Sequence, residues 1–329
     1  MALQEENKLL GTRRFLGACT AVAMAISYGA GAQNFPSKPI RIVASGVGGG
    51  SDFAIRAISS VLPASLGQPV IIDNRPGGVI PGDIVAKAPP DGYTLLVSTG
   101  ILWLAPFLQD NVPYDPIKDF APVVLINRAP NVLVVHPSVQ ARSVRELIDL
   151  AKANPGKLNY SSGQTGASNH MAAELFKAMV GVNIVRIAYK SSSTEIADLL
   201  GGQTQHFTFG TVGAVSPHVK SARIIALAVT SPQPSALFPG LPTVAASGVP
   251  GYESGTIAGL WAPARTPAPL VRRLNQEIVR VLEKPEIRER YLAAGSEVVA
   301  STPEQFAAVI KADAATWGKL IKSAGIRAE

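Results

Sequence analysis

The stretch that most constrains the fold runs from Arg41 to Leu62, where a glycine-rich turn joins an apolar run to a helical pattern. Ile40 to Ala44 is typical of a buried β-strand, and apolar residues from Ala54 to Leu62 recur on one helical face. The glycines at 46 and 48–50 allow a sharp bend and a close approach of the backbone to a ligand. The pattern therefore predicts a strand, a tight loop and a helix.

The start of such a helix is suited to binding an anion. Its first N–H groups lack partners within the helix, and its dipole is positive at that end. Ser51 and Asp52 stand where we expect the helix N-cap. A carboxylate would suit this site as well as a phosphate. A nucleotide is less favoured, because the glycine spacing differs from the dinucleotide fingerprint and no P-loop lysine follows. The alternative is a plain turn from strand to helix.

The first 32 residues are typical of a secretory signal peptide. Lys8, Arg13 and Arg14 precede an apolar run over 15–28, and Ala30-Gly31-Ala32 is a cleavage signal of small residues. The apolar run is too short to span a membrane as a helix. We therefore expect export to the periplasm and cleavage after Ala32, by the general route in preference to the twin-arginine route.

Cleavage would remove the only cysteine, Cys19, and lower the formal net charge of +7 by one unit. A mature chain without a thiol excludes thiol catalysis, disulfides and cysteine metal sites. Lysine and arginine are scattered, so nucleic-acid binding is not favoured, and the four histidines are too far apart in sequence to indicate a metal site. Because no nucleophile elbow or Ser-His-Asp arrangement is visible, we expect neither an enzyme nor a cofactor.

The mature length favours two α/β domains, since single hydrophobic cores stop growing near 300 residues. Val70 to Asp73 and Tyr93 to Ser98 are predicted strands with helical segments between them, which gives a β-α-β-α-β order and a parallel sheet. Ligands bind beyond the carboxyl ends of such strands. This places Thr99 and Gly100 beside the glycine-rich loop.

A second unit repeats this design. The apolar runs over 122–127 and 131–136 are interpreted as two separate segments. The second is predicted to be a strand that connects the first unit to the second. There, a strand ending at Ser162 leads through a polar loop into a helix near His170, and another strand ends before Tyr189 and Lys190. A loop of small residues is predicted after Gly210. We therefore predict domain I over 33–131 and 255–329, domain II over 132–254, and a cleft between them.

Short motifs along the whole mature chain resemble those of one known family. They are Phe35-Pro36-Ser37-Lys38-Pro39-Ile40-Arg41, Gly48-Gly49-Gly50-Ser51-Asp52, Asn74-Arg75-Pro76-Gly77, Ala88-Pro89-Pro90-Asp91-Gly92-Tyr93, Tyr114-Asp115-Pro116, Pro155-Gly156-Lys157-Leu158-Asn159-Tyr160 and Asp198-Leu199-Leu200-Gly201-Gly202-Gln203. In this order they resemble the Bug family, the extracytoplasmic solute receptors of tripartite tricarboxylate transporters.

The resemblance implies a periplasmic binding protein of type II-like architecture, with two α/β domains joined by crossover strands around a ligand cleft. It implies a receptor that captures a small organic anion bearing a carboxylate and delivers it to the permease subunits of the transporter. We expect a monomer. The alternatives are a soluble carboxylate sensor that presents its liganded form to a signalling partner and, less favoured, a secreted enzyme.

The resemblance also implies where the ligand binds, because the family holds a carboxylate through backbone amides and ordered waters of loops from both domains. Carried onto this chain, the expected ligand-binding residues are Ser45, Gly49, Gly50, Ser51, Asp52, Thr99, Gly100, Ser162, Thr165, Gly166, Ser168, His170, Tyr189 and Lys190. The chain departs from the family pattern at Ala44 to Val47, after Pro76 and near Phe209 to Thr211. The ligand is therefore left open among dicarboxylates, tricarboxylates, amino acids and aromatic acids.

Overall fold

The structure is a computed structural model that describes residues 35–202, 206–235, 238–323 and 325–327. The predicted signal peptide and its cleavage site lie outside these residues. Within the described ranges, every helix is too short or too polar to cross a lipid bilayer.

The first part of the sheet contains the predicted β-α-β-α-β unit. Its strands are β1 (Ile40–Ala44), β2 (Val70–Asn74), β3 (Thr94–Ser98), β4 (Phe120–Val135), β9 (Gly255–Pro263) and β10 (Glu297–Val298). β1 pairs in parallel with both β2 and β3, as the sequence predicts. β3 then pairs antiparallel with β9, and β9 antiparallel with β4, so that a strand from late in the chain lies between two early ones.

The second part of the sheet continues from the end of β4. It adds β5 (Asn159–Ser162), β6 (Val185–Ala188), β7 (Phe207–Thr211) and β8 (Ile225–Val229). The end of β4 pairs antiparallel with β7 and β8, while β5 pairs in parallel with β6 and β7. The strand order is therefore β2-β1-β3-β9-β4-β7-β5-β6.

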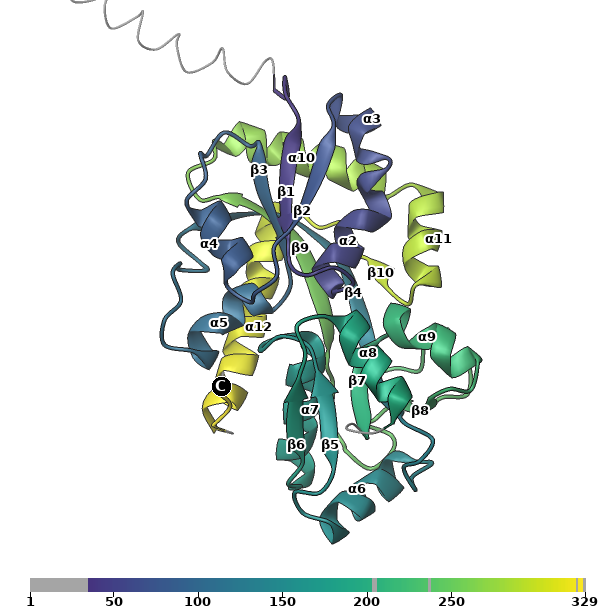
Figure 1. Ribbon diagram of the computed structural model, residues 1–329. Coiled ribbons are helices and arrows are strands. Elements are labelled where there is room, and N and C mark those ends of the chain that lie inside the picture. Colours follow the sequence, from purple (N-terminus) through teal and green to yellow (C-terminus); the bar gives the residue numbers. More distant parts are fainter. Residues whose placement is uncertain (1–34, 203–205, 236–237, 324, 328–329) are drawn as a thin grey trace, which may run out of the picture. The chain divides into compact units, whose positions relative to one another are not determined.

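β4 is one continuous strand, whereas the sequence suggested two separate apolar runs. Its pairing with β9 shifts register between Pro122 and Val124 and again between Leu125 and Asn127. Such irregularities let a strand continue past a proline, which lacks the N–H that a regular ladder needs. Figure 1 shows β4 and β9 running side by side. The predicted domain boundary after 131 falls where β4 stops pairing with β9 and begins to pair with β7 and β8. The division into two domains stays a prediction.

Eleven helices of the described residues surround these strands. They are α2 (Gly50–Ser59), α3 (Leu62–Leu66), α4 (Ile80–Ala86), α5 (Ile101–Leu108), α6 (Val144–Ala153), α7 (Ser168–Val180), α8 (Ser192–Gly201), α9 (Val212–Lys220), α10 (Ala268–Leu282), α11 (Pro285–Ala293) and α12 (Pro303–Ser323). The prediction of a loop after Gly210 is wrong, because α9 begins there and buries Val212 and Val215. The side chains of Ser143 and Thr302 stand before α6 and α12, and each accepts the backbone N–H three residues later.

The core packs on both faces of the sheet. In β4, Leu133 and Val135 join the cluster that contains α6 and α7, whereas Val132 and Val134 join the cluster that contains α8 and α9. This alternation is what the two-residue period of a strand requires. A third cluster packs β3, β9 and α12 around Trp103, Trp261 and Phe306. These layers hold the N-termini of the helices in place at the ends of the strands.

Candidate functional site

A cleft with an empty volume of about 670 Å³ lies where several helices begin. The starts of α2, α7, α8 and α9 line it, together with residues next to the start of α5. The lining residues from these helix starts are Gly49, Gly50, Ser51, Thr99, Ile101, Ala167, Ser168, Asn169, Ser191, Ser192, Thr211 and Ala214. The first N–H groups of each helix lack partners within that helix, and the dipole there is positive. The cleft therefore favours negative charge.

The structure brings about half of the sequence-predicted residues into this cleft. Those that line it are Ser45, Gly49, Gly50, Ser51, Thr99, Ser168 and Lys190. Gly100 and Gly166 line a smaller adjoining pocket, which shares Thr99, Ser168 and Thr256 with the cleft. Asp52, Ser162, Thr165, His170 and Tyr189 belong to neither lining, and each has a different role in the structure.

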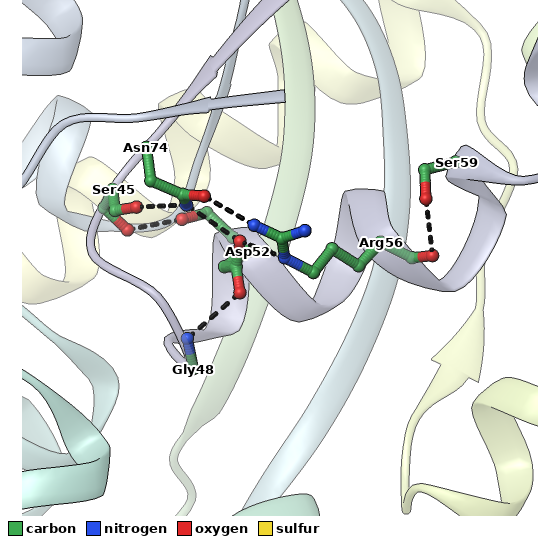
Figure 2. A network of polar contacts seen from close by, with 7 residues as sticks. Ser45, Gly48, Asp52, Arg56, Ser59 and Asn74 are labelled. Carbon is green, nitrogen blue, oxygen red and sulfur yellow. Dashed lines mark hydrogen bonds and ion pairs between the residues drawn. The ribbon is translucent and has the colours of Figure 1, made fainter. Parts of the chain in front are cut away.

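Asp52 fixes the glycine-rich loop from the first turn of α2 (Figure 2). Its carboxylate accepts hydrogen bonds from the backbone N–H of Gly48 at 3.0 Å, from Arg56 Nε at 2.7 Å and from Asn74 Nδ2 at 2.8 Å. The predicted capping by Ser51 or Asp52 is wrong, since Gly49, with an extended backbone, is the N-cap of α2. Asp52 instead reaches back from the first turn and holds the loop against the helix.

Asn74, at the end of β2, completes this support. Its Nδ2 also donates to the carbonyl of Ser45 at 2.8 Å, and its Oδ1 accepts from Arg56 at 2.6 Å. The hydroxyls of Ser45 and Ser51 lie 2.5 Å apart across the loop. Side chains thus fix both ends of the glycine-rich loop, so that its backbone is held in place beside the cleft.

The loop over 163–168 is held in a similar way by Arg186, which the sequence analysis missed. Its guanidinium donates to Ser162 Oγ at 2.8 Å, to Thr165 Oγ1 at 3.1 Å and to the carbonyl of Gly163 at 3.0 Å. A planar guanidinium suits three such acceptors at once. Nothing in the sequence around Arg186 marks it, because its partners precede it by more than twenty residues.

His170 supports the same loop as a hydrogen-bond acceptor. Its Nδ1 accepts the backbone N–H of Gly166 at 3.1 Å, and the side chain is buried. Burial, followed by the positive charges of Arg186 and Lys177, lowers the pKa of His170 to about 3. The ring is therefore neutral at any physiological pH, which fits an acceptor and not a cationic ligand group.

Tyr189 and Lys190 take separate positions although they are neighbours. The Tyr189 hydroxyl donates to the carboxylate of Asp198 on α8. Lys190 is exposed and lines the cleft, and the ion pairs found between described residues do not include it. Its ammonium group is thus able to approach an anion in the cleft.

Glu195 is a second residue that sequence reasoning missed. It lies in the first turn of α8, is 1% exposed and lines the cleft. Its carboxyl is within hydrogen-bond distance of Ser161 Oγ at 3.2 Å, Thr208 Oγ1 at 2.7 Å and Asn169 Nδ2 at 2.9 Å. Burial outweighs these hydrogen bonds and raises the pKa of Glu195 to about 7.

The Arg186→Lys variant tests whether the loop over 163–168 needs the guanidinium. Lysine keeps the charge but cannot reach all three acceptors, so about two hydrogen bonds, each worth about 1 kcal/mol, should be lost. We expect ligand affinity to fall about tenfold or more in calorimetric titration. Arg145→Lys, an exposed change on α6, should leave affinity unchanged. Equal affinities for both variants would contradict the assigned role of Arg186.

The described residues contain no group of three or more His, Cys, Asp or Glu side chains that could hold a metal ion. The cleft instead offers backbone N–H groups, hydroxyls, two side-chain amides, the ammonium group of Lys190 and the buried carboxyl group of Glu195. Such a set is suited to binding an anion without chemical change.

Comparison with known proteins agrees with this site. Residues 54–326 match the model of the tripartite tricarboxylate transporter family receptors. The chain is also 34% identical over 301 residues to the BugT protein of Bordetella pertussis, an alignment that covers 90% of this chain and 92% of BugT. The chain therefore belongs to the TctC/Bug family of extracytoplasmic solute receptors, which are binding proteins and not enzymes.

Solved structures give the same result. A protein of R. palustris solved with adipate superposes with a TM-score of 0.85 at 34% identity, covering 89% of this chain and 99% of that one. MatC from Rhodopseudomonas palustris, solved with bound malate, has a TM-score of 0.82 at 26% identity and covers 87% of this chain and 100% of that one. The α/β fold is thus that of the periplasmic binding proteins of this family, as the motifs predicted.

Proposed function

We propose that this receptor binds a small dicarboxylate in the cleft and delivers it to the permease subunits of a tripartite tricarboxylate transporter. The observation that carries the proposal is the convergence of helix N-termini on one cleft. Each presents N–H donors and a partial positive charge, and the walls between them are mainly glycine, serine and threonine. Such a wall suits a carboxylate group in size, in charge and in the geometry of its hydrogen-bond acceptors.

The residues proposed to contact the ligand are those of the two fixed loops. Gly49, Gly50 and Ser51 come from the first loop, and Ser168 begins the helix after the second. Lys190 would add its charge at the rim. Adipate and malate, bound by the two structural relatives, are both dicarboxylates, which supports this ligand class for the present chain.

A thermal-shift screen of residues 33–329 tests the ligand class. A dicarboxylate at about one hundred times its dissociation constant should stabilise the folded state by about 2.7 kcal/mol, because it binds the folded chain alone. We expect malate, adipate or a close relative to raise the melting temperature, and neutral amides of the same acids to have no effect. A protein that responds to the amides as strongly as to the acids would contradict carboxylate recognition.

Export to the periplasm with cleavage after Ala32, and a monomeric state, complete the proposal. The family to which the chain belongs acts outside the cytoplasm, which supports a cleaved leader. Mass spectrometry of protein recovered from the periplasm would give the mature N-terminus. A chain that begins at Gln33 agrees with the proposal, whereas an intact N-terminus contradicts it.

A further inference from the structure

The buried carboxyl group of Glu195 lies in a cleft that otherwise favours anions. Among the described lining residues, Glu195 and Lys190 are the charged types, and only Lys190 is exposed. An ionised carboxylate at this position would repel the ligand that the helix N-termini attract. The protonation state of Glu195 therefore bears directly on which ligands the cleft accepts.

The hydrogen bonds of Thr208 indicate that state. Its Oγ1 lies 3.0 Å from the carbonyl oxygen of Ser161 and 2.7 Å from Glu195 Oε1. The hydroxyl has a single hydrogen, so it donates to only one of these two oxygens. When it donates to the carbonyl, the contact with Glu195 is a hydrogen bond only if Oε1 carries a proton. A neutral Glu195 thus satisfies both contacts at once.

The contacts of Glu195 with Ser161 and Asn169 are compatible with either state, since Ser161 Oγ, 3.2 Å from Oε1, donates to that oxygen whether or not it is protonated. Asn169 Oδ1 accepts the backbone N–H of His170 at 2.9 Å, which orients the amide so that Nδ2 faces Glu195 Oε2 at 2.9 Å. Oε2 remains an acceptor whether or not Oε1 is protonated. The proton therefore belongs on Oε1, toward Thr208.

The charged and titratable groups around Glu195 come from β6, α7, α8 and the residues just before α8. Arg186 on β6 favours ionisation of Glu195, but less strongly than burial opposes it. On α7, burial keeps His170 neutral, and Glu174 pairs with Lys177. On α8, Asp198 accepts from Tyr189, and Lys190 lies at the rim before the helix.

We propose that Glu195 determines which ligands the cleft accepts: as a neutral carboxylic acid it tolerates a dianionic ligand, and its ionisation weakens the binding of that ligand. This inference rests on the proposed carboxylate function. The direction of the pH dependence follows from the charges, because a bound dianion makes ionisation of Glu195 less favourable. Ligand binding above the pKa of Glu195 therefore takes up a proton. As a result, the affinity for the dianion falls as pH rises. Once Glu195 is ionised, the cleft instead favours ligands that carry an ammonium group beside the carboxylate.

Calorimetric titration with malate at pH 6 and pH 8.5 tests the proposal, since the carboxyl groups of malate are ionised across this range. With a pKa of about 7, the neutral fraction of Glu195 falls about 30-fold between these two pH values, and affinity should fall by up to that factor. Titrations at pH 8.5 in buffers of different ionisation enthalpy should show uptake of about one proton per ligand.

Glu195→Gln replaces the acid with a neutral side chain of the same shape. We expect the ratio of its affinities at pH 6 and pH 8.5 to approach one, and proton uptake to vanish. Glu174→Gln changes another carboxyl on the neighbouring helix that does not line the cleft, and should keep the pH dependence of the wild type. A wild-type affinity that is flat or rises with pH, or the same slope in Glu195→Gln, overturns the inference.

A measurement without ligand separates this inference from the proposed function. The infrared difference spectrum between wild type and Glu195→Gln at pH 6 should contain the C=O band of a protonated carboxyl group. Absence of the band overturns the inference, whatever malate does. If the band is present and no carboxylate binds at any pH, Glu195 is neutral and the proposed function is what fails.

Discussion

Replacement of Gly50 by valine should weaken dicarboxylate binding about 100-fold, or about 2.7 kcal/mol, while the chain still folds. Gly50 is the first residue of α2, and a Cβ atom built on it would lie 2.9 Å from Thr256 Cγ2 and 3.5 Å from Thr99 Cγ2. Both threonines line the cleft. The valine methyl groups would displace them and cover the N–H groups at the helix start, which the ligand is proposed to contact.

The matched control for this variant is Gly201→Val. Gly201 is the last residue of α8, and an added Cβ would meet no atom within 4 Å. Both variants replace a helical glycine with the same branched side chain, and valine has the higher helix propensity, so propensity alone should weaken neither helix. Calorimetric titration should show lost affinity for Gly50→Val alone. Unchanged affinity in that variant would refute the assignment of the glycine-rich loop to the ligand site.

Trp261→Ala should have the largest effect on stability, and we expect it to lower the free energy of unfolding by about 3–5 kcal/mol. Trp261 lies on β9 and is 1% exposed. Its ring centroid is 5.8 Å from that of Trp103 and 4.7 Å from that of Phe306. Alanine would leave a cavity between α5, β9 and α12, which are far apart in sequence. Because a close-packed core fills such a cavity only in part, the contacts of the lost ring are not replaced.

Urea denaturation followed by circular dichroism would measure this loss. The control is Ile117→Ala, because Ile117 is 63% exposed and an exposed apolar side chain contributes little, within about 0.5 kcal/mol. A loss below about 1 kcal/mol for Trp261→Ala would mean that the Trp103–Trp261–Phe306 cluster is not tightly packed.

The sequence predicts the elements whose apolar pattern is regular and whose ends carry clear signals. β1 and the glycine-rich loop are predicted because the apolar pattern changes from the two-residue period of a strand to the 3.6-residue period of a helix. Gly202, with a φ of +66°, ends α8 in the left-handed conformation that glycine favours. α5 is missed because Ile101–Leu108 is buried on nearly all sides and shows no polar face. α9 is missed because Gly213 and Pro217 resemble a loop, whereas packing against β4 forms the helix.

The cleft is predicted in part for a similar reason. Its glycine and serine residues belong to local motifs, so Gly49, Gly50 and Ser168 are found from their own neighbours in sequence. Glu195 and Arg186 depend on partners that the fold brings together. In sequence, Glu195 follows a run of serine and threonine and resembles an exposed residue, whereas the fold buries it and brings Ser161, Asn169 and Thr208 to its carboxyl group.

The position of β9 in the sheet has a consequence for the order in which the chain folds. Leu96 on β3 pairs with Trp261, and Phe120 on β4 pairs with Pro263, so each of these early strands lacks one of its neighbours until the late strand has been made. Pairings between residues so distant in sequence form slowly, because a long loop must close first. A nascent chain that ends before residue 255 would therefore expose the edges of β3 and β4.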